Sequence, residues 1–437
     1  MGDERLIEAI RERALPLESD ADLDPLLELV DDARIVLLGE ASHGTSEYYT
    51  WRDRISRRLI AEKGFGFIAV EGDWPDCYTV NLYAKGWDDA GGEGRGARDV
   101  LHAFSRWPTW MWANEEVVAL AEWLREHNRG LPDERKAGFY GLDVYSMWES
   151  IDVVTRYLER VDPQLAERAR QSYGCFDPFE EDVQEYAWAT QAVPTDCEEE
   201  VLQALTALRQ KGPDFRRDNP EAYFNAEQNA LVATNAELYY RTMVRGGAAS
   251  WNVRDRHMME TLERLLKHHG PRSKAIVWEH NTHVGDARAT DMARAGMVNV
   301  GQLAREAYGN DVVIAGFSSY AGSVIAGGQW GAPMKRIPVP EARRGSWEHL
   351  FHQAGAEDKL VLLEGFDEVE GALDSRGHRA IGVVYHPERE KYGNYVPTVL
   401  PYRYDAMLYI DRSHALHPLH LEPVDDHEPP ETFPSGM

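Results

Sequence analysis

Cysteine is almost absent from this chain, which has only Cys77, Cys175 and Cys197 among its 437 residues. Three widely spaced thiols, an odd number, fit neither a disulfide framework nor a cysteine-based zinc site. Apolar runs are short as well, and none reaches the roughly 18 residues that a transmembrane helix needs. The first residues, MGDERLIEAIRERALPLESD, are charged and lack the apolar core of a secretory signal. These absences predict a protein of the reducing cytoplasm.

Positive charge is also in short supply, because 47 lysine and arginine residues face 74 aspartate and glutamate residues. The resulting formal net charge is -27. An acidic surface of this kind repels polyphosphates and anionic lipids. We therefore expect neither nucleic acid nor a membrane as a partner, and instead a small molecule. The sequence makes no prediction of oligomeric state.

Apolar residues make up 43% of the chain, which is enough for a large core. Helical stretches such as 47–62 and 115–128 separate short apolar runs. Continuous apolar strands that alternate with helices predict an α/β fold, with a mostly parallel sheet flanked by helices. The predicted strands are 34–38, 66–70, 137–142, 274–278, 312–317, 359–363, 380–385 and 406–410.

The strand signal disappears between about Trp148 and His269, where one helical pattern follows another. This predicts a large helical insertion that covers a pocket as a lid. The predicted division is a first part of the α/β core at 1–147, the insertion at 148–270, a second part of the core at 271–420 and a disordered tail at 421–437. The glycine-rich segment 86–98 does not open a helix after a strand, so we expect a polar loop without a cofactor role.

Chemically active side chains follow four of the predicted strands, at the sheet edge where open α/β sheets bind ligands. They are Glu40 and His43 after 34–38, Glu71 after 66–70, Asp143 after 137–142, and Glu279, His280 and His283 after 274–278. Carboxylates and imidazoles that converge at one edge are typical of a reaction site.

His43 is the strongest candidate for a general base, since a neutral imidazole takes a proton from water near neutral pH. Glu40 lies three residues earlier and could orient the ring and stabilise the imidazolium that forms. The competing interpretation is a turn in which Glu40 only caps a backbone group.

Arg52 lies on the same helical stripe as Tyr48 and Ile55, which puts a guanidinium on a buried face. Such a group needs a carboxylate or an anionic ligand, unless it extends to the helix edge. Glu71 ends an apolar strand and could pair with Arg52, hydrogen-bond His43 or bind a metal. A purely structural ion pair is the alternative.

His280 and His283 are three residues apart, a spacing that is only a weak metal signal. One or both could instead donate a hydrogen bond to a substrate carbonyl. His414, His417 and His420 repeat that spacing, but they adjoin a proline and the predicted tail, so a metal site there is the less favoured interpretation.

The aromatic run 107–112, together with Trp74 and Trp87, could form the wall of a large apolar pocket. Packing of a helix onto the sheet is the commoner fate of such rings. The residues predicted to bind substrate are Trp74, Trp110, Asp143 and Tyr145.

Serine and cysteine nucleophiles find no support in the sequence. No G-x-S-x-G elbow occurs, and the segment 316–322 has the wrong spacing for one. No cysteine stands beside a histidine. Direct attack by an activated water molecule is therefore favoured.

Several blocks of the sequence, taken together, resemble the erythromycin esterase family. They are LLGEASHGTSEYYTWRDR (37–54), FIAVEGDWPDC (67–77), FYGLDVYS (139–146), WNVRDRHM (251–258), VWEHNTHVGD (277–286) and GFSSYAGS (316–323). The resemblance extends in order from about residue 35 to residue 418. It implies an α/β core with a helical insertion, and hydrolysis of an ester such as a macrolide lactone. The catalytic positions that it implies are His43 for the general base, Glu40 for its acidic partner, Arg52, Glu71, His280 and His283.

Three functions are compatible with this pocket. The first is a carboxylic-ester hydrolase without a cofactor, in which His43 activates water; the resemblance links it to macrolide antibiotic resistance. The second is a metal-dependent hydrolase with Glu40, His43, Glu71 and His283 as ligands of a divalent ion. The third is a non-enzymatic module whose tryptophan-lined cleft binds a large apolar ligand or haem, although a pure binding pocket needs few titratable groups.

Overall fold

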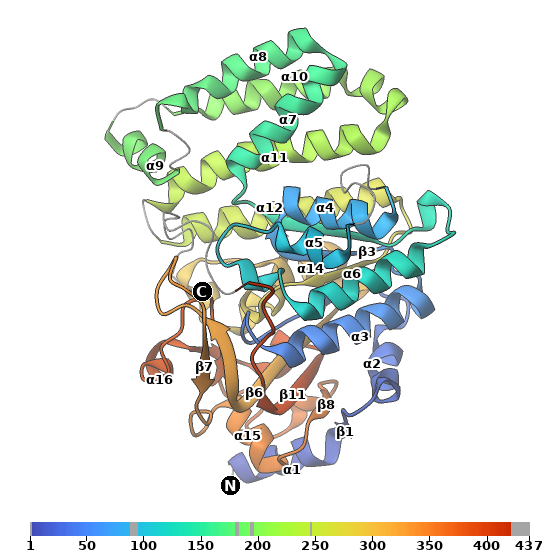
Figure 1. The fold of residues 1–437 in the computed structure, drawn as a ribbon. Helices are drawn as coiled ribbons and strands as arrows, with labels where there is room; N and C mark the ends of the chain where they lie inside the picture. The colour runs from blue at the N-terminus through green and yellow to red at the C-terminus, as the bar shows by residue number, and fades with distance from the viewer. Residues whose placement is uncertain (1, 88–94, 180–182, 193–195, 245–246, 421–437) are drawn as a thin grey trace.

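The computed structural model describes residues 2–87, 95–179, 183–192, 196–244 and 247–420, and Figure 1 shows their fold. Within these residues one nine-stranded sheet has the order β1-β8-β11-β6-β2-β5-β3-β4, with β7 paired to β6. The six neighbours from β11 to β4 are parallel, and β1, β7 and β8 pair antiparallel. The strands are β1 (Ala14–Pro16), β2 (Ile35–Leu38), β3 (Phe67–Asp73), β4 (Gly138–Asp143), β5 (Ala275–Trp278), β6 (Val312–Ala326), β7 (Lys335–Val339), β8 (Lys359–Leu362) and β11 (Ala406–Ser413). The predicted α/β class with a mostly parallel sheet is confirmed.

Two apolar cores cover the two faces of the sheet, because side chains of a strand alternate between its faces. In β2, Val36 and Leu38 join one core, while Ile35 and Leu37 join the other. Helices α2, α3 and α6 contribute to the first core, and α1, α12, α14 and α15 contribute to the second. Their bounds are α1 (Gly2–Arg13), α2 (Asp24–Val30), α3 (Ser46–Lys63), α6 (Glu115–Asn128), α12 (Ala248–His269), α14 (Val300–Tyr308) and α15 (Trp347–Ala354).

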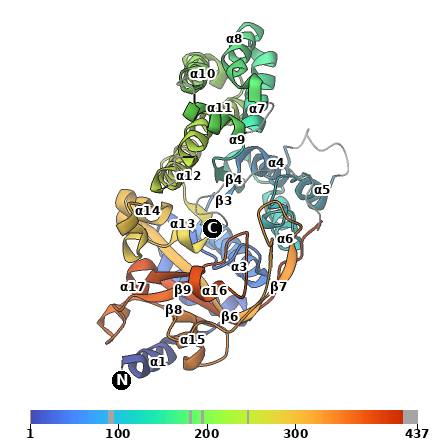
Figure 2. The ribbon, with the colours of Figure 1, turned by 90° about the vertical axis from the view of Figure 1, so that its left-hand side faces the viewer.

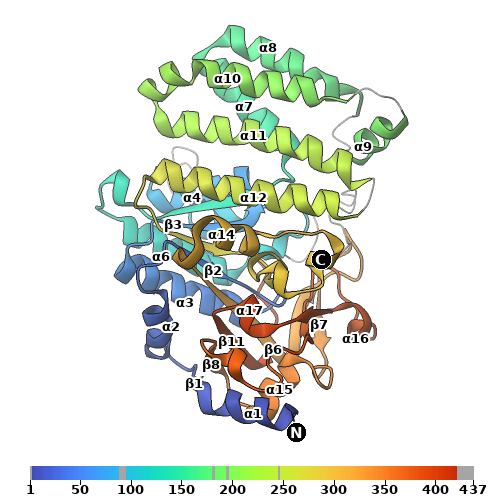
Figure 3. The same cartoon turned by 180° about the vertical axis from the view of Figure 1, so that it is seen from behind.

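Helices alone occupy the described part of the chain between β4 and β5. Before α12 they are α7 (Met147–Val161), α8 (Pro163–Tyr173), α9 (Val183–Ala192), α10 (Glu198–Asp218) and α11 (Pro220–Met243). These five helices surround a third apolar core and are stacked at one end of the molecule, as Figures 1 and 3 show. Helix α12 lies between this stack and α14, which is clearest in Figure 2. The large helical insertion is therefore present, and its action as a lid stays a prediction.

Residues 380–385 do not form the predicted strand. The preceding β9 (Arg376–Arg379) pairs instead with β10 (Tyr395–Thr398) in a separate two-stranded sheet. Ile381 makes only an isolated bridge to Ser42. The run is apolar because it is buried beside the loop after β2, where the backbone N–H of Ile381 donates to the loop, and not because it joins the main sheet.

Cys175 and Cys197 form a disulfide inside the helical insertion, between η4 (Gly174–Phe179) and the start of α10. Their Cα atoms are 6.0 Å apart although 22 positions separate them in sequence. The cysteine count predicted no disulfide framework, and this single bond was not foreseen from the sequence. Packing of the helices decides this pairing, so no local pattern announces it. Cys77 is free and buried.

Two segments that the sequence predicted to be flexible lie wholly or partly outside the described residues. The tail at 421–437 lies outside them, as does the central part of the loop 86–98. None of the helices that the structure does describe is both long and apolar enough to cross a membrane.

Candidate active site

A cavity lies at the carboxyl ends of the parallel strands. Strands β2, β5, β3 and β4 are neighbours in the sheet, so the segments that follow them meet at one edge. The polar side chains that the argument uses are His43, Glu71, Asp143, Tyr145 and Arg254, and the main aromatic ones are Phe104, Trp107, Trp112 and Trp330. A reactive polar end and an aromatic wall thus share one cavity.

The loop after β2 is held close against the segment after β5. Asn281 donates its backbone N–H to the carbonyl oxygen of Glu40 at 2.8 Å. Position 39 has no room for a side chain, since a Cβ on Gly39 would lie 2.1 Å from Oδ1 of Asn281. A Cβ on Gly44 would likewise lie 1.9 Å from the carbonyl oxygen of Ile325. The two glycines let the loop pack tightly enough to fix Glu40 between them.

Glu40 joins His43 to Arg52. Nδ1 of His43 lies 2.9 Å from Oε1 of Glu40, and Nη2 of Arg52 donates to Oε2 at 2.7 Å. Arg52 is fully buried, with its guanidinium 4.4 Å from the ring centre of Tyr49 and 4.7 Å from that of Trp278. The expected pairing of Arg52 with a carboxylate is confirmed, and Glu40 does more than cap a backbone group.

His43 is buried but lines the cavity. Burial opposes protonation, yet the charge of Glu71 and the hydrogen bond with Glu40 raise the pKa of His43 above its ordinary 6.5. Since Nδ1 faces the carboxylate, Nδ1 carries the proton in the neutral ring and Nε2 is the basic nitrogen. Nε2 makes no hydrogen bond to any residue that the structure describes. The ring is therefore arranged as a base toward the cavity.

Glu71 is bound by Arg254 of α12 and not by Arg52. Nη2 of Arg254 donates to Oε1 of Glu71 at 2.6 Å. The same guanidinium forms a two-point contact with Asp143, through Nε at 2.9 Å and Nη2 at 2.7 Å. Burial opposes the ionisation of Glu71, but its neighbours His283 and Arg254 lower its pKa below the ordinary value. Glu71 is therefore ionised and shares the guanidinium of Arg254 with Asp143.

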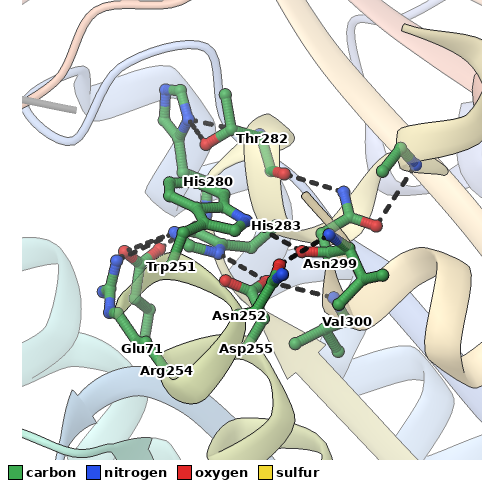
Figure 4. A network of polar contacts seen from close by, with 12 residues as sticks. Glu71, Trp251, Asn252, Arg254, Asp255, His280, Thr282, His283, Asn299 and Val300 are labelled. Atoms are coloured by element: carbon green, nitrogen blue, oxygen red, sulfur yellow. Dashed lines mark hydrogen bonds and ion pairs between the residues drawn. The ribbon is translucent and has the colours of Figure 1, made fainter. Parts of the chain in front are cut away.

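His283 lies behind Arg254, as Figure 4 shows. Nη1 of Arg254 is 2.9 Å from Nε2 of His283, and Nδ1 of His283 is 2.9 Å from Oδ1 of Asp255. A guanidinium can only donate, so Nε2 accepts and Nδ1–H donates to Asp255. The ring also stacks on Trp251, with ring centres 4.5 Å apart. Both ring nitrogens of His283 are thus bound by Arg254 and Asp255. Arg254 belongs to the cavity lining, and His283 does not.

His280 packs directly against the base. Its ring centre is 4.9 Å from that of His43, and its Nδ1 accepts the backbone N–H of Thr282 at 3.3 Å. Burial, and then the proximity of His43, lower the pKa of His280 well below 6.5, so the ring is neutral. Its backbone N–H donates to Oε2 of Glu71 at 2.8 Å. His280 therefore connects the two networks by packing and through its main chain.

Two of the four residues predicted to bind substrate line the cavity, and two do not. Asp143 and Tyr145 belong to the lining. Trp74 is fully buried in the opposite core, where its ring stacks on Tyr140 and its Nε1 donates to Asn225. Trp110 is fully buried too. Neither ring is part of the described lining, so the structure does not bring either of them to the cavity. Packing of the core accounts for the burial of both.

Several residues of the site were not singled out from the sequence. Arg254 and Asp255 lie on α12, and a helical pattern alone does not show which face of this helix meets the strand ends. Their one available signal is the block WNVRDRHM, which belongs to the family resemblance. Trp107 and Trp112 lie in the aromatic run that was noted, but the choice between these rings and Trp110 depends on which side of a short turn faces the cavity.

The four residues predicted as ligands of a divalent metal belong to two separate networks. Glu40 and His43 are in one, and Glu71 and His283 are in the other. The oxygens of Glu40 contact His43 and Arg52, while those of Glu71 contact Arg254 and the N–H of His280. Among the described residues, no three histidine, cysteine, aspartate or glutamate side chains are arranged to hold a metal ion. The donor set in this arrangement does not fit a metal.

The C-terminal histidines are also separated from one another by their partners. Nδ1 of His414 is 2.6 Å from Glu47, and Nδ1 of His417 is 2.8 Å from Glu116. The ring of His420 contacts that of His102. The first two pairs attach the last described segment of the chain to the starts of α3 and α6, which gives these histidines a structural role.

Comparisons with known proteins agree with this architecture. The family model for erythromycin esterase matches residues 60–413. The chain is 22% identical over 375 residues to erythromycin esterase type II of Escherichia coli, a match that covers 81% of this chain and 86% of that protein. A solved structure described as a succinoglycan biosynthesis protein has a TM-score of 0.74 at 21% identity, covering 95% of this chain and 98% of that one. A mutant of the erythromycin esterase EreC in its open conformation has a TM-score of 0.67 at 17% identity, covering 94% and 99%.

Proposed function

This chain belongs to the erythromycin esterase family, and from that premise we propose that it hydrolyses carboxylic esters with a water molecule activated by His43. The observation that carries the proposal is the state of His43. Its ring lines the cavity, its Nδ1 is held by Glu40, and its Nε2 has no partner among the described residues. This is the arrangement that a general base for water requires.

In the first step, Nε2 of His43 takes a proton from water, and the hydroxide attacks the carbonyl carbon of the ester. Glu40 orients the ring and stabilises the imidazolium. Arg52 holds Glu40 through the buried contact at 2.7 Å. The general-base contact contributes a factor of roughly 10²–10⁴ to the rate.

Arg254 is the group best suited to stabilise the oxyanion that this attack creates. Its Nε–H and both N–H groups of Nη2 bind Glu71 and Asp143, and one N–H of Nη1 faces His283. One N–H of Nη1 is left for the substrate oxygen. The proposal thus gives Arg254 the carbonyl contact that the sequence suggested for His283 or His280. His283, held by Asp255, acts as a positioning residue for Arg254.

The second step completes the hydrolysis. The tetrahedral intermediate collapses, the bond between the carbonyl carbon and the alcohol oxygen breaks, and His43 returns its proton to the departing alkoxide. An acid and an alcohol are released, or a single hydroxy acid when the ester is a lactone. Aromatic rings line the cavity beside its reactive polar end, and family membership makes a macrolide lactone one candidate beside simpler esters.

The direct test is a mass-spectrometric screen of macrolides and simpler esters for a product that gains one water. We expect such a product with the native protein and a strong loss with His43→Ala. His127→Ala changes a partly exposed histidine of α6 that does not belong to the cavity lining, and it serves as the matched control. Near-full turnover by His43→Ala contradicts the mechanism, and the absence of any hydrolysed ester contradicts the function.

A further inference from the structure

One acidic side chain of the cavity has no ion-pair partner among the described residues. Asp76 lies in the first turn of α4 (Trp74–Lys85) and lines the cavity. It makes no hydrogen bond or ion pair with any residue in the described part of the chain. Burial and the nearby charge of Glu149 raise the pKa of Asp76 to about 6, against the opposing charge of Arg106, so the carboxylate is mostly ionised at neutral pH.

The cations of the cavity are already engaged. Arg254 binds Glu71 and Asp143, as described above. Nη1 of Arg106 lies 2.9 Å from Oδ2 of Asp73, and its Nη2 donates to the hydroxyl of Tyr240. The acidic side chains of the lining are Glu71, Asp73, Asp76 and Asp143, and they face Arg106, Arg254 and His43. Burial raises the pKa of Asp73 well above its ordinary value, and Asp76 forms no ion pair within the described structure. An unpaired carboxylate in the cavity wall disfavours an anionic ligand and favours a cationic one.

The rest of the cavity wall has the character that suits an organic cation. Trp107 and Trp330 are adjacent, with ring centres 4.6 Å apart, and both belong to the lining together with Phe104. Aromatic faces attract an alkylammonium group through the ring quadrupole, and they also exclude water from its methyl groups. A carboxylate beside such a wall binds a tertiary or quaternary ammonium, whereas a small hydrated ion gains little from the aromatic surface.

We propose that the substrates of this chain are esters that carry an alkylammonium group, which Asp76 binds against the aromatic wall formed by Phe104, Trp107 and Trp330. The inference rests on the proposed ester hydrolysis and assigns Asp76 as a residue that determines specificity. The ammonium group lies in the same cavity as His43, so one bound substrate places its charge at Asp76 and its ester bond at His43.

The first test measures binding alone and needs no turnover. The probes are choline and its uncharged isostere, in which a tert-butyl group replaces the trimethylammonium group, and the readout is quenching of tryptophan fluorescence. We expect the native protein to bind choline about tenfold more tightly, the factor that corresponds to about 1.4 kcal/mol. Asp76→Asn should bind both probes alike. Glu12→Gln removes one charge from the exposed face of α1 and should keep the preference.

Equal binding of the two probes by the native protein overturns the inference, as does a preference that survives in Asp76→Asn. Because the probe comparison is made on the native protein, it decides whether the cavity prefers a cation even if the variant does not fold.

The second test separates this inference from the proposed function. Benzoylcholine is compared with the benzoate ester of the uncharged isostere, and we expect a KM about tenfold lower for the cationic ester. Hydrolysis of both esters with equal KM leaves ester hydrolysis standing and contradicts cation recognition. Preferred binding of choline without hydrolysis of either ester leaves cation recognition standing and counts against ester hydrolysis.

Discussion

Nη2 of Arg254 lies 2.6 Å from Oε1 of Glu71, which ties a helix of the large insertion to a strand end of the core. The two residues are 183 positions apart in sequence. Asp143, at the end of the next strand, shares the same guanidinium. The insertion is thus part of the reactive end of the cavity and does more than extend the molecule.

The first prediction concerns this guanidinium. Arg254→Lys keeps the positive charge but loses the two-point contact with Asp143 and the N–H proposed for the oxyanion. We expect the rate of ester hydrolysis to fall by about 10²–10³. Arg264→Lys, on the same helix, changes an arginine that pairs with Glu227 outside the cavity and should retain the native rate. Equal rates for the two variants would contradict the role of Arg254.

The second prediction is a pH profile. A base must be neutral to act, and the environment raises the pKa of His43 above 6.5. With an uncharged ester, kcat/KM should therefore rise with pH and reach half its maximum above pH 6.5. Glu40→Gln removes a charge that stabilises the imidazolium, so the midpoint should move to lower pH while the maximal rate falls. An unchanged midpoint would show that a group other than His43 controls the profile.

The third prediction follows from Glu279, which is fully buried and whose two carboxyl oxygens have no hydrogen-bond partner in the described structure. Burial and the charge of Glu71 raise its pKa well above the ordinary value, so the folded chain keeps it protonated. An acid whose pKa is raised by folding costs stability as pH rises above the pKa of the unfolded chain. Glu279→Gln removes that cost, because glutamine stays neutral.

The measurement for Glu279 is urea unfolding at about pH 5 and about pH 8. We expect Glu279→Gln to gain stability relative to the native chain as pH rises, so the difference in free energy of unfolding, variant minus native, should be larger at about pH 8 than at about pH 5. Glu12→Gln, on the exposed surface of α1, controls for the change in net charge. The same difference from the native chain at both pH values would mean that Glu279 ionises in the folded protein as it does in the unfolded one.

The fourth prediction concerns the disulfide of the insertion. Closing a loop with a sequence separation of 22 stabilises a folded chain by about 3 kcal/mol in the chain-entropy model. A reducing agent should therefore lower the Tm of the native protein, measured by circular dichroism. Cys175→Ser already lacks the bond, so its Tm should be lower and insensitive to the reducing agent. A native Tm that reduction leaves unchanged would contradict a stabilising role.

The fifth prediction addresses the metal alternative. The oxygens of Glu40 and Glu71 are engaged by arginines, an imidazole and a backbone N–H. Dialysis against a chelator should therefore leave the rate of ester hydrolysis unchanged, and elemental analysis should find less than one metal ion per chain. Loss of activity on chelation, with recovery on adding zinc or another divalent ion, would instead favour a metal-dependent hydrolase.

The sequence could predict much of the site because strand ends are local features. An apolar run followed by a carboxylate or histidine is visible in one line of sequence, and parallel strands bring such ends to one edge. The spacing of three between Glu40 and His43 allowed their contact within one turn, which the structure bears out at 2.9 Å. The stripe that includes Arg52 required a buried partner for its charge.

Other features depend on how distant segments pack. Glu71 had several plausible partners, and the position of α12 selected Arg254. The sequence does not distinguish one tryptophan from another. In the structure, Trp74 faces the core beneath α11, while Trp107 faces the cavity. Residues 380–385 have the apolar character of a strand, yet their neighbours in space leave them only isolated bridges.

The sequence by itself determined the α/β class, the strands whose ends carry the reactive groups, and the pair Glu40–His43, because each depends on periodicity or short spacing. Only the tertiary structure decided that Arg254 unites Glu71 with Asp143, that Cys175 meets Cys197, and that Asp76 lines the cavity without a partner. The physical reason is that the energy of a buried charge or a cross-link depends on what surrounds it in space, and residues that are far apart along the chain provide those surroundings.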